Sequence, residues 1–237
     1  MQPDETLDKT DVVILCGGFG TRLRSVLGDR PKPMALIHEK PFLEILVNHV
    51  AGFGFRRFIF CVHHMAENIQ KHFEKFDGLE TIFSKEETPL GTAGALRLCE
   101  PLIKSSTVLI LNGDSFCSVD LNQLLVFHTE SQRAASLVLT KDPTRRDGGF
   151  IRFGENGRIL AFHEKKNVTD APYINAGIYA FTREVIHSIP EGRPCSLENE
   201  IFPSLIPEGL YGYVTEQSLD DIGTPERLEN FKLGFQS

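Results

Sequence analysis

Short apolar runs alternate with helix-like segments through the first half of the chain. Apolar runs bounded by polar residues or glycine are typical of buried parallel strands. These runs lie at residues 12–16, 57–62, 81–84 and 107–111. Apolar side chains recur at helical spacing at residues 42–50, 66–76 and 92–102. The alternation predicts βαβ units and a mostly parallel sheet, with loops at the carboxyl ends of the strands forming a ligand-binding face.

The second half of the chain has a more mixed pattern. Its candidate strands lie at residues 136–140, 150–153, 158–162, 178–181 and 211–215, and its candidate helices at 197–205 and 226–235. The segment Glu155-Asn-Gly157 predicts the tight turn of a β-hairpin, because Asn-Gly adopts the positive φ angles that such turns need. The whole pattern predicts an α/β fold, a Rossmann-like three-layer α/β/α arrangement with a mixed, mostly parallel central sheet.

Composition and charge narrow the class of protein. The chain has 237 residues, 41% of them hydrophobic, which predicts a single domain over residues 1–237 with halves at about 11–120 and 121–237. A formal charge of −7 argues against a nucleic-acid binder, since such proteins carry a net basic face. Because no apolar run is long enough to span a membrane and the N-terminus is acidic and polar, we expect a cytoplasmic protein without a membrane partner.

A glycine-rich loop follows the first predicted strand. Gly17, Gly18 and Gly20 interrupt the apolar run, and Arg22 and Lys32 supply positive charge close behind it. Glycines allow phosphate oxygens to approach backbone N–H groups closely, so the loop predicts an anion-binding site. A dinucleotide fingerprint would need a third glycine where Leu23 stands, and a Walker A loop would need Gly-Lys-Ser/Thr. Neither of these commoner phosphate motifs fits.

The segments Leu15-Cys-Gly-Gly-Phe-Gly-Thr-Arg-Leu-Arg24 and Pro31-Lys-Pro-Met34 resemble the signature of the sugar-phosphate nucleotidyltransferases, a GGxGTRL loop followed by PKP. The resemblance covers nearly all of the chain from Val12 onward. It implies transfer of a nucleotidyl group from a nucleoside triphosphate to a sugar 1-phosphate, with release of pyrophosphate. It also implies that Arg22 contacts the triphosphate and the leaving pyrophosphate, and that Lys32 approaches the α-phosphate. The nucleotide site implied includes Leu15, Gly17, Gly18, Gly20, Thr21, Asn112 and Gly113.

Two aspartates are candidate metal ligands. Asp114 follows an apolar strand in Asn112-Gly-Asp114, which places its carboxylate at the mouth of the sheet. Mg²⁺ prefers one or two carboxylates together with phosphate oxygens and waters, so Asp114 needs a partner. The resemblance implies that Asp221, in Leu219-Asp-Asp-Ile-Gly-Thr224, is that partner and that the pair holds Mg²⁺. The structural alternative is that both aspartates only cap turns beside glycines.

Further segments are candidates for recognition of the base and the sugar. In Pro89-Leu-Gly-Thr-Ala-Gly94 the backbone of Gly91 and Thr92 could face a base, or could simply begin a helix. The resemblance implies that this form of the segment belongs to members that use GTP. It also implies a sugar-phosphate pocket that contains Gly148, Glu164, Lys165 and Asn175. Asp147 and Lys166 depart from the family pattern, which leaves the sugar open.

Cysteines and histidines complete the set of reactive side chains. Five cysteines without a CxxC pair predict reduced, buried thiols. Cys16 is expected to be a small strand residue rather than a nucleophile, because the implied reaction needs no covalent intermediate. His63 and His64 are expected to be exposed loop residues.

The resemblance favours the D-glycero-α-D-manno-heptose 1-phosphate guanylyltransferases, with Mg²⁺, GTP and manno-heptose 1-phosphate. Mannose 1-phosphate is the alternative sugar, and other sugar 1-phosphates with another triphosphate rank behind it. A non-catalytic sugar-nucleotide sensor and a glycosyltransferase are hypotheses of other classes. The glycosyltransferase would want a D-x-D at a strand end, and Asn112 lacks the first carboxylate. A homo-oligomer is left open.

Overall fold

Nine strands form one central sheet in the computed structural model, which describes residues 7–18, 20–28, 30–74, 76–130, 133–141, 149–164 and 173–235. The main path through this sheet runs β10-β9-β11-β6-β1-β4-β5, and β8 joins β11 to β12 beside it. The strands are β1 (Asp11–Leu15), β4 (Arg57–Val62), β5 (Glu80–Lys85), β6 (Thr107–Asn112), β8 (Ala135–Lys141), β9 (Gly149–Phe153), β10 (Ile159–Glu164), β11 (Tyr173–Thr182) and β12 (Leu210–Thr215).

Most strands of this sheet run in one direction. Strands β6, β1, β4 and β5 are mutually parallel, and β12 is parallel to β8. Strand β11 is antiparallel to β6, β8 and β9, and β10 is antiparallel to β9. Only β10 and β11 of the nine described strands therefore run against the rest. The mixed, mostly parallel sheet predicted from the sequence is confirmed.

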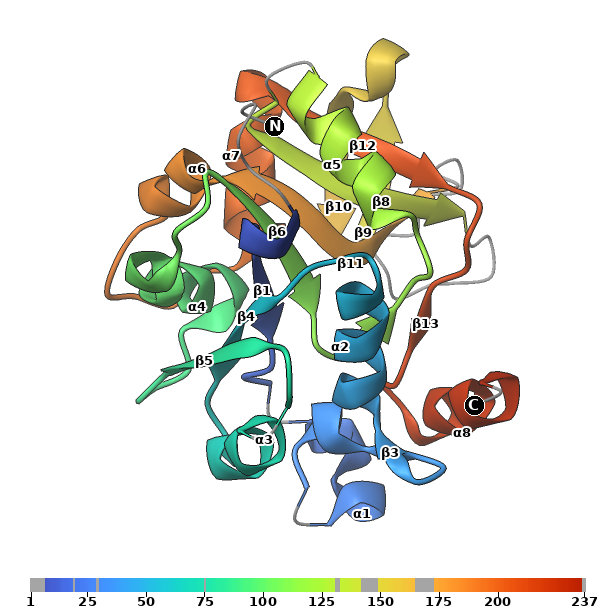
Figure 1. Ribbon diagram of the computed structural model, residues 1–237. Helices are drawn as coiled ribbons and strands as arrows, with labels where there is room; N and C mark the ends of the chain where they lie inside the picture. The colour runs from blue at the N-terminus through green and yellow to red at the C-terminus, as the bar shows by residue number, and fades with distance from the viewer. Residues whose placement is uncertain are drawn as a thin grey trace.

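Helices cover both faces of the sheet (Figure 1). On one face, α2 (Phe42–Gly52), α3 (Ala66–Phe73) and α5 (Leu121–Glu130) bury their apolar sides in the core that contains Val12 and Ile14 of β1. On the other face, α4 (Gly91–Cys99), α6 (Arg183–Ser188) and α7 (Phe202–Gly209) pack in the core that contains Val13. Alternate residues of one strand thus face two cores, as strand geometry requires. The layers are α/β/α, as predicted.

A third, smaller core lies at one end of the molecule. It joins Phe42 and Ile45 of α2 to Leu228 and Phe231 of α8 (Pro225–Gly234), and Leu23 packs there too. In Figure 1, α8 (red) lies at the end of the molecule that also carries β3 (Lys40–Pro41) and α1 (Arg24–Leu27). β3 pairs with β2 (Leu36–Ile37). Through this core, α8, the last helix of the chain, packs against Leu23 in the segment that follows β1.

The predicted strands and helices agree with the structure apart from their ends. The helix predicted at 92–102 ends at Cys99 and continues as a 3₁₀ turn over Glu100–Leu102, which contains Pro101, a residue without a backbone N–H. The helix predicted at 197–205 begins as a π-helix over Leu197–Ile201 and continues as α7. The strand predicted at 178–181 is the end of the longer β11, and helices α1, α5 and α6 were not predicted.

The structure contains no described helix that is both long and apolar enough to cross a membrane.

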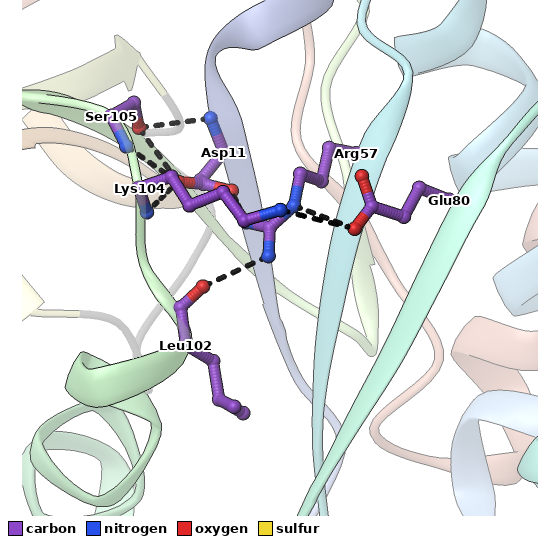
Figure 2. A network of polar contacts seen from close by, with 6 residues as sticks. All are labelled: Asp11, Arg57, Glu80, Leu102, Lys104 and Ser105. Atoms are coloured by element: carbon purple, nitrogen blue, oxygen red, sulfur yellow. Dashed lines mark hydrogen bonds and ion pairs between the residues drawn. The ribbon is translucent and has the colours of Figure 1, made fainter.

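A buried carboxylate joins the starting ends of the parallel strands (Figure 2). The side chain of Asp11, at the start of β1, is fully buried and forms an ion pair with Arg57 at the start of β4. Its Oδ2 accepts hydrogen bonds from the backbone N of Lys104 at 2.6 Å and of Ser105 at 2.8 Å. Arg57 also contacts Glu80 at the start of β5 and donates to the carbonyl of Leu102 at 3.0 Å. Strands β1, β4 and β5 and the loop before β6 are thus fixed at one end.

A segment from the second half of the chain covers the start of α4. The carbonyl of Cys195 accepts hydrogen bonds from the backbone N of Ala93 at 3.0 Å and of Gly94 at 3.2 Å. The Thr92 hydroxyl accepts from the backbone N of Leu197 at 2.9 Å and donates to Glu198 at 3.0 Å. Gly91 has a φ of +71°, and a Cβ there would lie 2.6 Å from the Cys195 carbonyl oxygen. These contacts use backbone donors that an isolated helix would leave free.

We expect Asp11→Asn to lower the free energy of unfolding by about 3–5 kcal/mol, because it removes the buried countercharge of the Arg57 guanidinium and leaves only the exposed carboxylate of Glu80. Urea denaturation measures the loss. Glu80→Gln is the matched control: its side chain is 54% exposed, so we expect a loss of under about 1 kcal/mol. A loss for Asp11→Asn no larger than that of the control would contradict the role given to the buried carboxylate.

Thr92→Val should lower the free energy of unfolding by roughly 1–3 kcal/mol, since the backbone N–H of Leu197 loses its acceptor. Thr92→Ser keeps the hydroxyl and should retain most of the stability. Urea denaturation of both variants, measured side by side, compares them. A loss close to zero for Thr92→Val, or a larger loss for Thr92→Ser than for Thr92→Val, would contradict the role given to the hydrogen bonds of the hydroxyl.

Candidate active site

The glycines after β1 each have a different neighbour. A Cβ on Gly17 would lie 2.7 Å from Oε1 of Glu86, whereas a Cβ on Gly18 would meet no atom within 4 Å. Gly20 has a φ of +57° and packs against Lys32, whose Cβ would lie 3.0 Å from a Cβ at Gly20. The loop therefore needs glycine for a close contact at Gly17 and for backbone conformation at Gly20. At Gly18 the backbone faces open space.

A first cavity lies at the carboxyl ends of β1 and β6 and has a volume of about 310 Å³. It is lined by Leu15, Gly17, Gly18, Glu86, Pro89, Gly91, Thr92, Ala95, Asn112 and Asp114. Six of the residues predicted to bind the nucleotide line it. Gly113 does not line the cavity but contacts residues beside it. Its N–H donates to the Leu15 carbonyl at 3.0 Å, and a Cβ there would lie 2.9 Å from Sγ of Cys16. Thr21 begins a 3₁₀ turn after the loop.

Glu86 is a wall residue of this cavity that the sequence analysis did not identify. It follows β5, is only 4% exposed, and accepts the backbone N–H of Leu90 at 2.8 Å through Oε2. Its other oxygen faces Gly17. Burial raises the pKa of the Glu86 carboxyl, and the Leu90 N–H and nearby His63 act in the opposite direction. The signal in the sequence was a carboxylate directly after a strand on the predicted ligand-binding face.

The expectation for the paired histidines is half right. His64 is exposed, as predicted. His63 is half-buried, contrary to the prediction, because its Nδ1 lies 3.0 Å from the Glu86 carbonyl oxygen at the edge of the cavity.

The second cavity has a volume of about 200 Å³ and shares Asn112 and Asp114 with the first. Its lining consists of Arg22, Lys32, Asn112, Asp114, Ser115, Asn175, Ala176, Gly177, Leu219, Asp221, Gly223 and Arg227. It brings together both predicted catalytic cations, both predicted metal ligands and one predicted sugar ligand. Because two of its residues also line the first cavity, the two hollows adjoin at Asn112 and Asp114.

Two short strands bring the aspartates together. β7 (Ser115–Phe116) pairs antiparallel with β13 (Asp220–Asp221), so that Asp221 lies opposite Ser115. The backbone N of Ile222 donates to the Asp114 carbonyl at 3.1 Å. The Nζ of Lys32 lies 2.6 Å from Oδ2 of Asp114. Residues far apart in the chain thus present two carboxylates and an ammonium group to the same cavity.

Arg227, another residue that the sequence analysis missed, pairs with Asp221. Its Nη1 lies 3.2 Å and 3.4 Å from the two carboxylate oxygens, and the N–H of Gly223 donates to Oδ1 of Asp221 at 2.7 Å. Arg227 lies in the first turn of α8, where the Thr224 hydroxyl accepts its backbone N–H. The sequence predicts the helix that contains Arg227. The direction of the Arg227 side chain depends on where α8 packs, which the sequence does not show.

Two amide side chains, those of Asn112 and Asn175, line the second cavity. Asn175 donates from Nδ2 to the Tyr179 hydroxyl at 2.9 Å and accepts the N–H of Gly177 at 2.9 Å. Gly177 has a φ of +74°, and a Cβ there would lie 2.7 Å from Oγ of Ser115. Burial raises the pKa of the fully buried Tyr179, which stays a neutral phenol. Within the described residues, Oδ1 of Asn112 is buried without a hydrogen-bond partner.

The predicted sugar residues are only partly described. Glu164 is the last residue of β10, and Gly148 and Lys165 lie outside the described residues. Asn175 lines the second cavity, with both ends of its amide already engaged in the contacts above. The predicted role of these four residues therefore stays a prediction.

Cys16 is a buried thiol packed against Gly113, between the cavity residues Asn112 and Asp114 in the chain. Burial, and to a smaller extent the charge of Asp114, raise the pKa of Cys16 far above its usual value, so the sulfur stays protonated. A protonated, buried thiol is a poor nucleophile. All five cysteines are free and buried, as predicted.

The chain matches known proteins along most of its length. A family model described as nucleotidyl transferase matches residues 11–235. The mannose-1-phosphate guanylyltransferase of Mycobacterium tuberculosis is 36% identical over 223 residues, which are 92% of this chain and 62% of that protein. The D-glycero-alpha-D-manno-heptose 1-phosphate guanylyltransferase of Campylobacter jejuni is 32% identical over 220 residues, which are 92% of this chain and 97% of that protein.

A solved structure shares the whole fold. The crystal structure of HddC from Yersinia pseudotuberculosis superposes with a TM-score of 0.84 at 29% identity and covers 96% of this chain and 100% of its own. The chain spans about six tenths of the length of the mannose-1-phosphate relatives it matches. Because the family model matches nearly all of the chain and the Campylobacter relative aligns over nearly its whole length, the chain belongs to the nucleotidyl transferase family.

Proposed function

We propose that this chain is an enzyme that transfers a guanylyl group from GTP to a sugar 1-phosphate, releasing pyrophosphate and forming a GDP-sugar. The observation that carries the proposal is the junction of two cavities at Asn112 and Asp114. The first cavity suits a nucleoside, since it is lined mainly by backbone and apolar groups. The second suits phosphates, because Arg22, Lys32 and Arg227 line it. A phosphorus atom at the junction would be within reach of both substrates.

Glu86 supports guanine as the base. Guanine carries two adjacent donors, N1–H and N2–H₂, on its Watson–Crick edge, and a carboxylate is an acceptor with two oxygens. Leu90 fixes the Glu86 carboxylate in the wall of the first cavity, so its orientation is set before a base binds. The names of the relatives support the same base, and the Yersinia HddC structure is also known in complex with GMP-PN.

The sugar is proposed as a class. The names of the relatives support manno-heptose 1-phosphate and mannose 1-phosphate about equally: the first through the relative matched along its whole length, the second through relatives of higher identity. We keep manno-heptose 1-phosphate as the first candidate and mannose 1-phosphate as the alternative. The division into a nucleotide half at about 11–120 and a sugar half at about 121–237 stays a prediction.

In the proposed reaction, an oxygen of the sugar phosphate attacks the α-phosphorus of GTP. The bond from the α-phosphorus to the oxygen that bridges to the β-phosphate breaks, and that oxygen leaves with pyrophosphate. The protein has little covalent work, so catalysis rests on holding two anions in line and neutralising their charge. Lys32 and Arg22 are the groups we propose for this work, since both line the cavity that would receive the phosphates.

The donor set of the second cavity fits a magnesium ion. Asp114 and Asp221 supply two carboxylates on adjoining backbone segments. The Lys32 ammonium forms an ion pair with Asp114, so this carboxylate already binds a cation. Mg²⁺ is bound in this way by one or two carboxylates plus substrate phosphates. We propose that these two aspartates hold Mg²⁺, which when bound would neutralise phosphate charge.

Asp114→Asn and Asp221→Asn should each lower kcat on the order of 10²-fold or more with the fold retained, because the amide keeps the volume and loses the charge. The measurement is pyrophosphate release with Mg²⁺ over a grid of GTP, UTP, CTP, ATP and dTTP against mannose, manno-heptose and glucose 1-phosphates. Exposed Asp220, next to Asp221, provides the matched control, and Asp220→Asn should stay near wild type.

The grid also decides between classes of function. Turnover with GTP and mannose or manno-heptose 1-phosphate supports the proposal. Turnover only with another triphosphate would contradict the assignment of guanine as the base. Binding of GTP or a GDP-sugar, without turnover of any combination of substrates, would identify a sensor instead.

Glu86→Gln should lower kcat/KM for GTP by roughly 10- to 100-fold, because a charged acceptor for the guanine donors becomes a neutral amide with an N–H₂ group of its own. The value for ATP, already low, should change much less. Glu87→Gln alters the exposed neighbouring carboxylate and should leave both values unchanged. An equal fall for GTP and ATP would mean that Glu86 only supports the wall of the cavity.

A further inference from the structure

Each carboxylate proposed for the metal already has a cationic partner from its own chain. The Lys32 ammonium lies 2.6 Å from Asp114, and the Arg227 guanidinium lies 3.2 Å from Asp221. The side chains of Lys32 and Asp221 are largely buried, at 14% and 11% exposure. The charges balance within these two pairs, and Arg22 adds a further positive charge to the lining of the second cavity.

The two cations surround one point beside Asp221. A Cβ on Gly223 would lie 3.7 Å from Nζ of Lys32, 3.8 Å from Nη1 of Arg227 and 2.6 Å from Oδ1 of Asp221. A glycine is needed at this position for the three side chains to gather there. The Lys32 ammonium, which contacts Asp114, thus also lies near Gly223, the glycine whose N–H donates to Asp221.

The position of Arg227 is unfavourable for the helix that carries it. The first turn of a helix has a positive electrostatic potential, which disfavours a cation by about 0.3–1 kcal/mol at an exposed site. Arg227 lies in that turn of α8, with its backbone N–H capped by Thr224. Its two contacts with the Asp221 carboxylate offset this cost. The residue is therefore explained by the cavity and not by the helix.

We propose that Lys32 and Arg227 are internal counter-cations that keep a divalent metal ion off Asp114 and Asp221 until a triphosphate fills the second cavity. A divalent ion entering alone would meet two positive groups, and the burial of Lys32 and Asp221 reduces the screening of these charges by solvent. A triphosphate supplies phosphate oxygens as new partners for both cations and as ligands for the metal. Lys32 then leaves Asp114 for a phosphate, which is where the proposed reaction needs it. Arg227 is a positioning residue that acts through Asp221.

The inference rests on the proposed function for the two metal ligands and for the triphosphate, and it is tested by metal binding without turnover. Mn²⁺, visible by electron paramagnetic resonance, is titrated into protein free of nucleotide. We expect weak binding to the wild type, and binding at least about tenfold tighter to Arg227→Gln and to Lys32→Gln, since each removes one repelling charge. Arg227→Lys keeps the charge and should bind as weakly as the wild type. Asp221→Asn should bind more weakly still.

A second titration measures the coupling between metal and nucleotide. A non-hydrolysable GTP analogue should tighten Mn²⁺ binding to the wild type by a larger factor than to either glutamine variant, because the variants have lost the barrier that the analogue removes. Structural damage would weaken metal binding, so tighter binding is a result that damage does not produce. Thermal melting checks each fold, and if Arg227→Gln does not fold, Lys32→Gln alone carries the test.

Unchanged or weaker Mn²⁺ binding in the folded glutamine variants would overturn the inference. So would tight binding to the wild type without nucleotide. These outcomes are separate from a failure of the proposed function, which would appear as a silent pyrophosphate grid whatever the metal titration gives.

Discussion

The buried carboxylate of Asp11 is the constraint on which the arrangement of the site depends. An ionised group without access to water is tolerated only when it is fully paired, and Asp11 finds its partners on β4 and on the loop before β6. These contacts fix the relative positions of β1, β4 and β6 at their starting ends. Parallel pairing then carries the same register to the other ends, where Leu15 lies beside Asn112 and Cys61. The glycine loop and the Asn112-Gly-Asp114 turn therefore emerge side by side.

The geometry of the two cavities follows from close approaches that only glycine allows. Gly17 leaves room for the Glu86 carboxylate, Gly91 for the Cys195 carbonyl, and Gly223 for the charges around Asp221. The contact at Gly91 gives the segment Leu90-Gly-Thr-Ala-Gly94 a structural role in addition to the predicted contact with a base. Its helix start is covered by residues of the second half, so Gly91 and Thr92 join the halves of the chain as well as lining the first cavity.

The sequence predicted those parts of the structure whose signal is local. The central strands were visible as apolar runs, because strands buried on both faces carry few polar residues. Lys32, Asp114 and Asp221, which line the second cavity, could be named as candidates because they stand in recognisable segments. Glu86 and Arg227 were missed because their importance depends on packing: one is a strand-end carboxylate beside Gly17, the other a helix residue aimed at Asp221. The length of β11 was underestimated because Asn175 and Gly177 resemble a turn, whereas they form an irregularity within the strand.

The central claim is that an oxygen of a sugar phosphate attacks the α-phosphorus of a nucleoside triphosphate at the junction of the two cavities. The most direct test uses a sugar 1-phosphate labelled with ¹⁸O in its non-bridging phosphate oxygens, followed by mass spectrometry of both products. We expect every labelled oxygen to remain in the sugar nucleotide and the released pyrophosphate to be unlabelled. Label in the pyrophosphate, or release of inorganic phosphate in its place, would contradict it.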